Sequence, residues 1–125
     1  MKRILLALAL VASPLGGLMA HETAKGPHGG PVVDSAGHHV EMVSTGAELV
    51  LFLTEGDDKP LASAGAKNAR AIVQDGGKTT TVQLNPAEPN KLVGTLPNPL
   101  GAGARVVVSA TLADGHAVQA RFVKN

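Results

Sequence analysis

The chain has 125 residues, enough for one small domain with a modest hydrophobic core. It contains no cysteine, which excludes disulfides, thiolate metal sites and a lipid anchor on cysteine. Its 11 Lys and Arg nearly balance 10 Asp and Glu without forming a basic block, which argues against nucleic acid as a partner.

Residues 1–20 have the three parts of a secretory signal peptide. Lys2 and Arg3 supply the positive end, residues 4–12 are apolar, and a small residue, Ala20, precedes the expected cut. The apolar run is too short to span a bilayer stably. We therefore expect cleavage after Ala20, export to the periplasm, and no stable membrane anchor on the mature protein.

Residues 21–31 are polar and glycine-rich, which predicts a flexible arm in front of a β-domain over residues 32–125. The remaining chain alternates short apolar runs with Gly, Asp, Asn and Pro clusters. After a first strand beginning at Val32, strands are predicted over residues 38–44, 48–54, 68–75, 78–84, 91–96, 105–112 and 117–124. Residues 48–54 are continuously apolar, which favours a central strand buried on both faces. Residues 85–90 are predicted to be a loop.

This pattern predicts seven or eight short strands at spacings of roughly 8–12 residues and no helical period beyond the signal. Such a pattern is typical of an all-β, antiparallel β-sandwich of the immunoglobulin-like type. A small β-barrel is the alternative. No internal repeat or second domain is visible.

The candidate metal ligands gather near the start of the mature chain, because imidazole suits Cu(II) and Zn(II) and no thiolate is present. His39 and Glu41 lie two residues apart on one strand face and can share an ion, whereas His38 points to the other face. Cleavage after Ala20 would give His21 a free amine beside its ring. The predicted ligands of a copper or zinc ion are His21, His28, His38, His39 and Glu41. Two further side chains are assigned elsewhere: Met42 to the core and His116 to an exposed turn.

The run GPHGGPVVDSAGHHVEMV, residues 26–43, resembles the opening segment of a known family. It is similar to the periplasmic adaptor subunits of heavy-metal efflux pumps of the cobalt-zinc-cadmium and copper-silver kinds, and to small stand-alone periplasmic proteins thought to accompany those pumps. The matching positions are Gly26, Pro27, His28, Gly29, Gly30, Val32, Val33, Gly37 and Glu41. Residues 49–73 look like the adaptors' following segment of a strand, a Lys-Pro turn and another strand.

The resemblance extends to about Gln74, and the adaptors' coiled-coil hairpin and lipoyl-like halves are absent. It implies a periplasmic metal-binding accessory or carrier protein in heavy-metal efflux or resistance, with an efflux adaptor subunit as a possible partner. The mechanism would be ligand exchange from the His-bearing arm. The alternative is a β-sandwich that docks onto an adaptor by an exposed strand edge and binds no metal.

An enzyme is not expected. Ser109, Asp114 and His116 are the residue types of a hydrolase triad, but no nucleophile-turn signature accompanies them. For metal binding at the arm, replacing His28 and His39 together is predicted to weaken affinity strongly. Replacing His116 is predicted to matter little, because no other histidine is near it in sequence.

Overall fold

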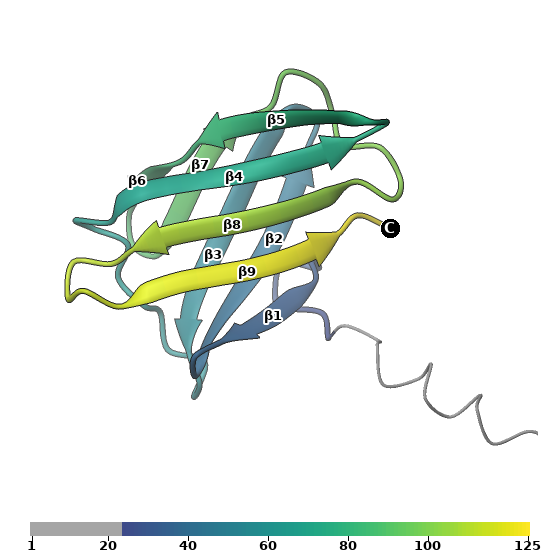
Figure 1. Cartoon of the computed structure of the whole chain (residues 1–125). Coiled ribbons are helices and arrows are strands. Elements are labelled where there is room, and N and C mark those ends of the chain that lie inside the picture. The colour runs from purple at the N-terminus through teal and green to yellow at the C-terminus, as the bar shows by residue number, and fades with distance from the viewer. Residues whose placement is uncertain (1–23) are drawn as a thin grey trace, which may run out of the picture.

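A computed structural model describes residues 24–125, which form nine β-strands and no helix (Figure 1). The predictions for residues 1–20, including the cleavage site, and for His21 lie outside the described residues. The strands are β1 (Val32–Ser35), β2 (His38–Thr45), β3 (Glu48–Glu55), β4 (Lys67–Asp75), β5 (Lys78–Gln83), β6 (Asn85–Ala87), β7 (Lys91–Thr95), β8 (Arg105–Thr111) and β9 (Ala117–Val123).

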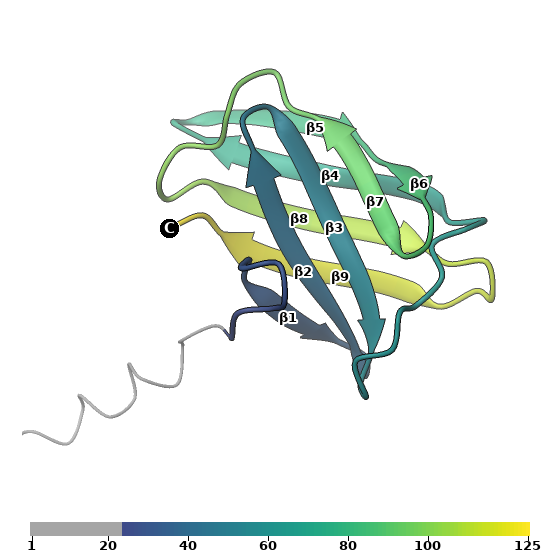
Figure 2. The ribbon, with the colours of Figure 1, turned by 180° about the vertical axis from the view of Figure 1, so that it is seen from behind.

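The strands form two antiparallel sheets that pack face to face as a β-sandwich (Figures 1 and 2). One sheet has five strands in the order β1-β2-β3-β7-β6, and the other has four in the order β5-β4-β8-β9. The expected all-β antiparallel sandwich is confirmed, and the two sheets are separate rather than one closed barrel. The additional strand is β6, which lies in the predicted loop and pairs with β7, with Asn85 opposite Val93.

Two tight turns fix the register of the hairpins at the expected places. Ala36 and Gly37 both have positive φ, 52° and 87°, between β1 and β2. Gly76 and Gly77 do the same between β4 and β5, at 59° and 83°. Two consecutive residues with positive φ match the right-handed twist of the flanking strands, which explains why glycine occupies three of these four positions; Ala36 is the exception.

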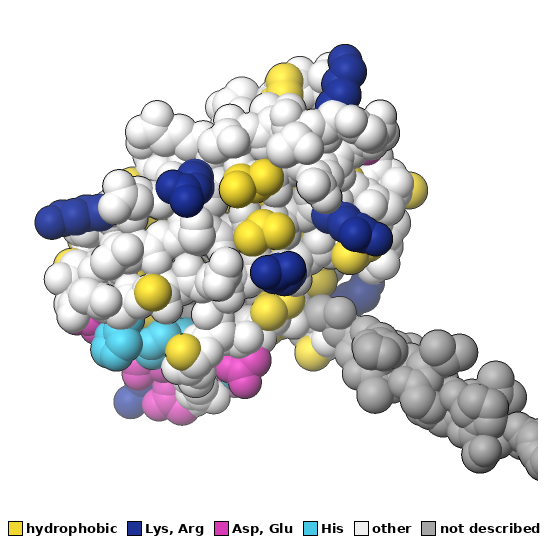
Figure 3. Space-filling view, in the orientation of Figure 1, with side chains coloured by type: hydrophobic (Ala, Val, Ile, Leu, Met, Phe, Trp, Pro, Cys, Tyr) yellow, Lys and Arg dark blue, Asp and Glu magenta, His cyan; other side chains and the backbone are white. Residues whose placement is uncertain are grey.

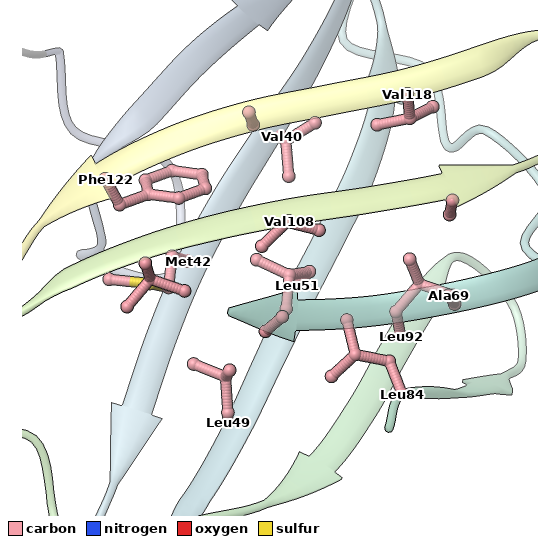
Figure 4. Close-up of a cluster of buried hydrophobic side chains, with 14 of the residues drawn as sticks. Val40, Met42, Leu49, Leu51, Ala69, Leu84, Leu92, Val108, Val118 and Phe122 are labelled. Atoms are coloured by element: carbon pink, nitrogen blue, oxygen red, sulfur yellow. The ribbon is translucent and has the colours of Figure 1, made fainter. Parts of the chain in front are cut away.

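The core lies between the sheets and is built almost entirely from aliphatic side chains (Figure 4). Every second residue of the paired strands points inward, as the alternation of β8 and β9 predicts. Its largest contributors include Val40, Met42, Leu49, Leu51, Leu53, Leu92, Val106, Val108, Val118 and Phe122. Burial of each such side chain contributes about 1.5–3 kcal/mol relative to exposure, so this layer supplies the main driving force for folding.

The central strand β3 is buried on only one face, which differs from the prediction for residues 48–54. Leu49, Leu51 and Leu53 face the core, whereas Val50 and Phe52 on the other face are only partly buried. The reason is that the described residues cover the outer face of the five-stranded sheet only in part. Around Phe52 the cover comes from the segment that precedes β1.

Candidate functional site

Residues 24–31, here called the N-terminal loop, fold back on themselves and lie against β2 (purple in Figure 2). Gly26 N–H donates to the Gly30 carbonyl at 2.8 Å, and Val32 N–H donates to the Ala24 carbonyl at 2.8 Å. The Pro31 carbonyl accepts from Met42 N–H at 3.0 Å, which attaches the loop to β2. Residues 24–31 thus form a hydrogen-bonded turn on β2, within the segment 21–31 for which a flexible arm was expected; residues 21–23 lie outside the described residues.

Two glycines allow the loop to approach the sheet this closely. A Cβ on Gly30 would overlap the carbonyl oxygen of Met42, and one on Gly26 would overlap the carboxylate of Glu41. The neighbour of Gly30 is backbone, which cannot move aside without breaking strand pairing. The GPHGG sequence is therefore required for close packing of backbone on β2.

Glu41 is the centre of this arrangement and is only 4% exposed, although it lies on the outer face of β2. Its Oε2 accepts hydrogen bonds from the backbone N–H groups of His28 and Gly30, both at 2.9 Å. Its Oε1 lies 2.9 Å from Nδ1 of His28. Three donors thus compensate the burial of one carboxylate, as buried charges require.

The imidazole of His28 is held from two sides. Its ring stacks on Phe52 with centroids 3.7 Å apart and an interplanar angle of 6°. An ionised carboxylate can only accept hydrogen bonds, so Glu41 accepts from the backbone amides and also from Nδ1–H of His28. In this tautomer the free lone pair of the ring lies on Nε2. The side chain is 48% exposed, and no hydrogen bond from the described residues engages Nε2. The result is a fixed imidazole with one available nitrogen.

The predicted ligands do not converge on one point. His28 and Glu41 are in contact, and His39 shares the outer face of β2 with Glu41, but no hydrogen bond links His39 to either. His38 points to the opposite face of the strand, as the alternation predicted. Within residues 24–125, no three His, Asp or Glu side chains are grouped so that they could together hold a metal ion. His21 lies outside the described residues.

Sequence reasoning missed a contact between His38 and His116. Their rings lie edge to face, with centroids 5.5 Å apart and an interplanar angle of 84°. His116 Nδ1 is 2.7 Å from Oδ2 of Asp114, whose Oδ1 accepts the His116 backbone N–H at 3.0 Å. The sequence did place His116 in a hairpin turn, after Asp114 and Gly115. It gave no sign that this turn would lie beside the start of β2, because that position depends on how the two sheets pack.

Charge is distributed unevenly around the two histidine contacts. A surface depression beside His28 is also lined by Lys25, Arg121 and Lys124. Around the His38–His116 contact the charged residues of the neighbouring turns are mostly Asp and Glu, and Figure 3 shows histidine beside acidic side chains at that end. The two places therefore differ in the sign of their surrounding charge.

No known protein family, curated protein or solved structure matches the chain. Residues 24–125 contain no helix long and apolar enough to cross a membrane.

Proposed function

We propose that this protein is an exported accessory or carrier that binds a transition metal, copper or zinc, in heavy-metal efflux or resistance. The observation that carries the proposal is the fixed imidazole of His28. Its Nδ1 is bonded to a carboxylate, and its ring is stacked on Phe52. A carboxylate on one imidazole nitrogen is the usual partner of a histidine that binds metal through the other.

In this proposal His28 is the ligand and Glu41 is a positioning residue. Both carboxylate oxygens of Glu41 already accept hydrogen bonds, so the group orients the ring and keeps the lone pair on Nε2. A single protein nitrogen leaves most coordination positions open. Open positions suit a carrier, because the receiving protein can bind the ion before the donor releases it.

The wider context follows from the sequence. The signal-like residues 1–20 support a periplasmic location, and the GPHGG pattern supports an efflux adaptor subunit as partner. We further propose that the sandwich is of the immunoglobulin-like type; its two antiparallel sheets and the passage of the chain between them support this. The proposed role involves exchange of metal ligands and no making or breaking of covalent bonds.

A second candidate function is a docking module that binds no metal. The hydrogen bonds of the N-terminal loop account for GPHGG without an ion, because His28 and both glycines pack around Glu41. Lys25, Arg121 and Lys124 around the nearby depression also disfavour a free cation there. These features favour contact with an acidic surface of an adaptor.

Titration with Cu(II) and Zn(II) separates the two candidates. The purified exported protein is titrated as wild type and as the His28→Asn variant, and the two affinities are compared. Asparagine keeps the backbone N–H and a side-chain N–H for Glu41 but removes the imidazole. His39→Asn is the matched control, since His39 lies on the same face without contacting Glu41 through a hydrogen bond.

The metal proposal predicts that the wild-type protein and His39→Asn bind alike, whereas His28→Asn loses one metal site, or weakens that site at least about tenfold, and still unfolds cooperatively. Equal binding by His28→Asn and wild type would remove His28 as the ligand and favour the docking module. Loss of binding in His39→Asn as well would define a two-histidine site on the outer face of β2.

A further inference from the structure

Three turns meet at the end of the sandwich where β2 begins and β9 begins. His38 follows the β1–β2 turn, and His116 precedes β9 on the other sheet. Glu55 pairs with His38 across β2 and β3, and the turn after it approaches Gly37, since a Cβ on Gly56 would lie 3.2 Å from the Gly37 carbonyl oxygen. This end is separated from the basic depression, which is lined by the last residues of β9.

The two imidazoles are spaced as ligands of one ion would be. Their centroids are 5.5 Å apart. With metal–nitrogen bonds of about 2.0–2.1 Å and tetrahedral geometry, two imidazole centroids on one ion are separated by roughly 5 Å. The rings come from different sheets, His38 from the start of β2 and His116 from the turn before β9, so an ion bound by both would join the two sheets.

One ring nitrogen of His38 has no partner. Nδ1 of His38 is buried and forms no hydrogen bond with the described residues. Buried polar atoms in folded proteins are almost always paired, so this imidazole, unlike most, is not held in place by a hydrogen bond at Nδ1. His38 differs here from His28, whose Nδ1 is bonded to Glu41.

His116 has the complementary arrangement. Its Nδ1 is 2.7 Å from Asp114 Oδ2, which directs the opposite nitrogen, Nε2, toward ligand binding. The other carboxylate oxygen of Asp114, Oδ1, accepts the backbone N–H of His116 at 3.0 Å, so two contacts with the same carboxylate orient the ring.

The surroundings are acidic. Glu55, Asp57 and Asp58 lie at the end of β3 and in the turn that follows, and Asp114 lies at the β8–β9 turn. The nearby cation Lys59 is 3.7 Å from an oxygen of Asp57, which it partly neutralises. Histidine and acidic side chains are adjacent at this end in Figure 3. Such a surface raises the local concentration of cations, unlike the basic depression near His28.

We propose that His38 and His116 form a two-histidine site for a divalent transition cation, with Asp114 as the residue that positions His116. Imidazole ligands bind Cu(II) more strongly than Zn(II), so Cu(II) is the tightest occupant. Water completes the coordination, because the described residues offer no third ligand in the same group. This site shares no residue with the proposed His28 site, so either can fail without the other.

The test is a Cu(II) titration of the purified exported protein, followed by calorimetry and electron paramagnetic resonance. His116→Asn is the main variant, because His116 is exposed on a turn and its loss leaves the core intact. His39→Asn is the control, since it lies on the same strand as His38 but on the other face. Both are also made in the His28→Asn background, so that the His28 site does not contribute.

In the His28→Asn background we expect one Cu(II) site with hyperfine coupling to two nitrogens. His116→Asn is expected to weaken it more than about tenfold and remove one nitrogen coupling, whereas His39→Asn leaves both unchanged. Bound Cu(II) should raise the melting temperature of the His28→Asn protein, because it joins the two sheets, and should not do so after His116→Asn.

Unchanged affinity and coupling after His116→Asn would overturn the proposal, as would equal loss in the His39→Asn control. If His28→Asn alone abolishes all Cu(II) binding, the His38–His116 site is refuted while the His28 site stands. If His28→Asn changes nothing but His116→Asn removes Cu(II) binding, the His28 site is refuted while the His38–His116 site stands.

Discussion

The carboxylate of Glu41 and the imidazole of His28 form a single unit across 13 positions of sequence, with Oε1 2.9 Å from Nδ1. The unit also includes two backbone N–H groups of the loop that carries His28. Glu41 thus converts a glycine-rich segment into a fixed part of the sheet's outer surface. Two consequences for stability can be measured directly.

Gly30→Ala should destabilise the protein by about 3 kcal/mol or more, because the new methyl group overlaps the Met42 carbonyl oxygen and forces the loop away from β2. Gly29→Ala is the matched control. Gly29 has φ of 84° and no atom near its would-be Cβ, so alanine there costs only the left-handed backbone strain, about 1–2 kcal/mol. Urea denaturation of both variants measures the difference. A Gly30→Ala protein as stable as Gly29→Ala would show that the loop does not pack closely on β2.

Glu41→Ala should cost about 2–4 kcal/mol, because it leaves the N–H groups of His28 and Gly30 and one ring nitrogen without their acceptor. Glu41→Gln should cost less, since one side-chain oxygen still accepts from the two amides. Its NH₂ group then faces Nδ1 of His28, which must become an acceptor and move its proton to Nε2.

Nitrogen-15 chemical shifts of the His28 ring report that change of tautomer. A purely structural Glu41 predicts loss of stability without loss of metal affinity in Glu41→Gln, whereas a positioning role predicts weaker binding with the fold intact. The same ring tautomer in wild type and Glu41→Gln would contradict the hydrogen-bond assignment.

The sandwich was predictable because its signals are local. Alternation placed Val106 and Val108 inward, and consecutive turn residues such as Gly76 and Gly77 placed a hairpin. Strand β6 was not predictable, because Asn85–Ala87 contains a proline and acquires its partner only from the edge of β7.

The candidate site was predicted only in part. Alternation correctly placed His39 and Glu41 on one face and His38 on the other. The burial of Glu41 was missed, because polar composition suggested a mobile arm and gave no sign that its amides would converge on a carboxylate. The contact of His38 with His116 was missed because it joins segments 78 positions apart, and only the packing of the two sheets brings them together.

A second link between the sheets is the hydrogen bond from the backbone N–H of Gln119 to Oγ of Ser35, at 3.1 Å. The Ser35 hydroxyl of β1 thus provides the acceptor for a backbone N–H of the edge strand β9. Ser35→Ala should cost about 1–2 kcal/mol and speed hydrogen exchange at the Gln119 amide, because that donor then has no protein acceptor. Ser44→Ala, a substitution on β2 outside the core, is the control. Unaltered exchange at Gln119 in Ser35→Ala would mean that water or another group satisfies the amide.

The Asp114–His116 contact predicts a specific titration. The pKa of Asp114 is lowered from 3.8, first by the His116 backbone N–H and then by its ring. A carboxyl with a lower pKa in the folded state contributes stability above its unfolded pKa, and this contribution is lost as pH falls through the folded pKa. Carbon-13 titration of Asp114 should give a midpoint below 3.8 in the wild type. In His116→Asn the midpoint should rise only partway, because the backbone donor, the larger cause, remains. A midpoint at or above 3.8 in the wild type would contradict the contact that orients His116.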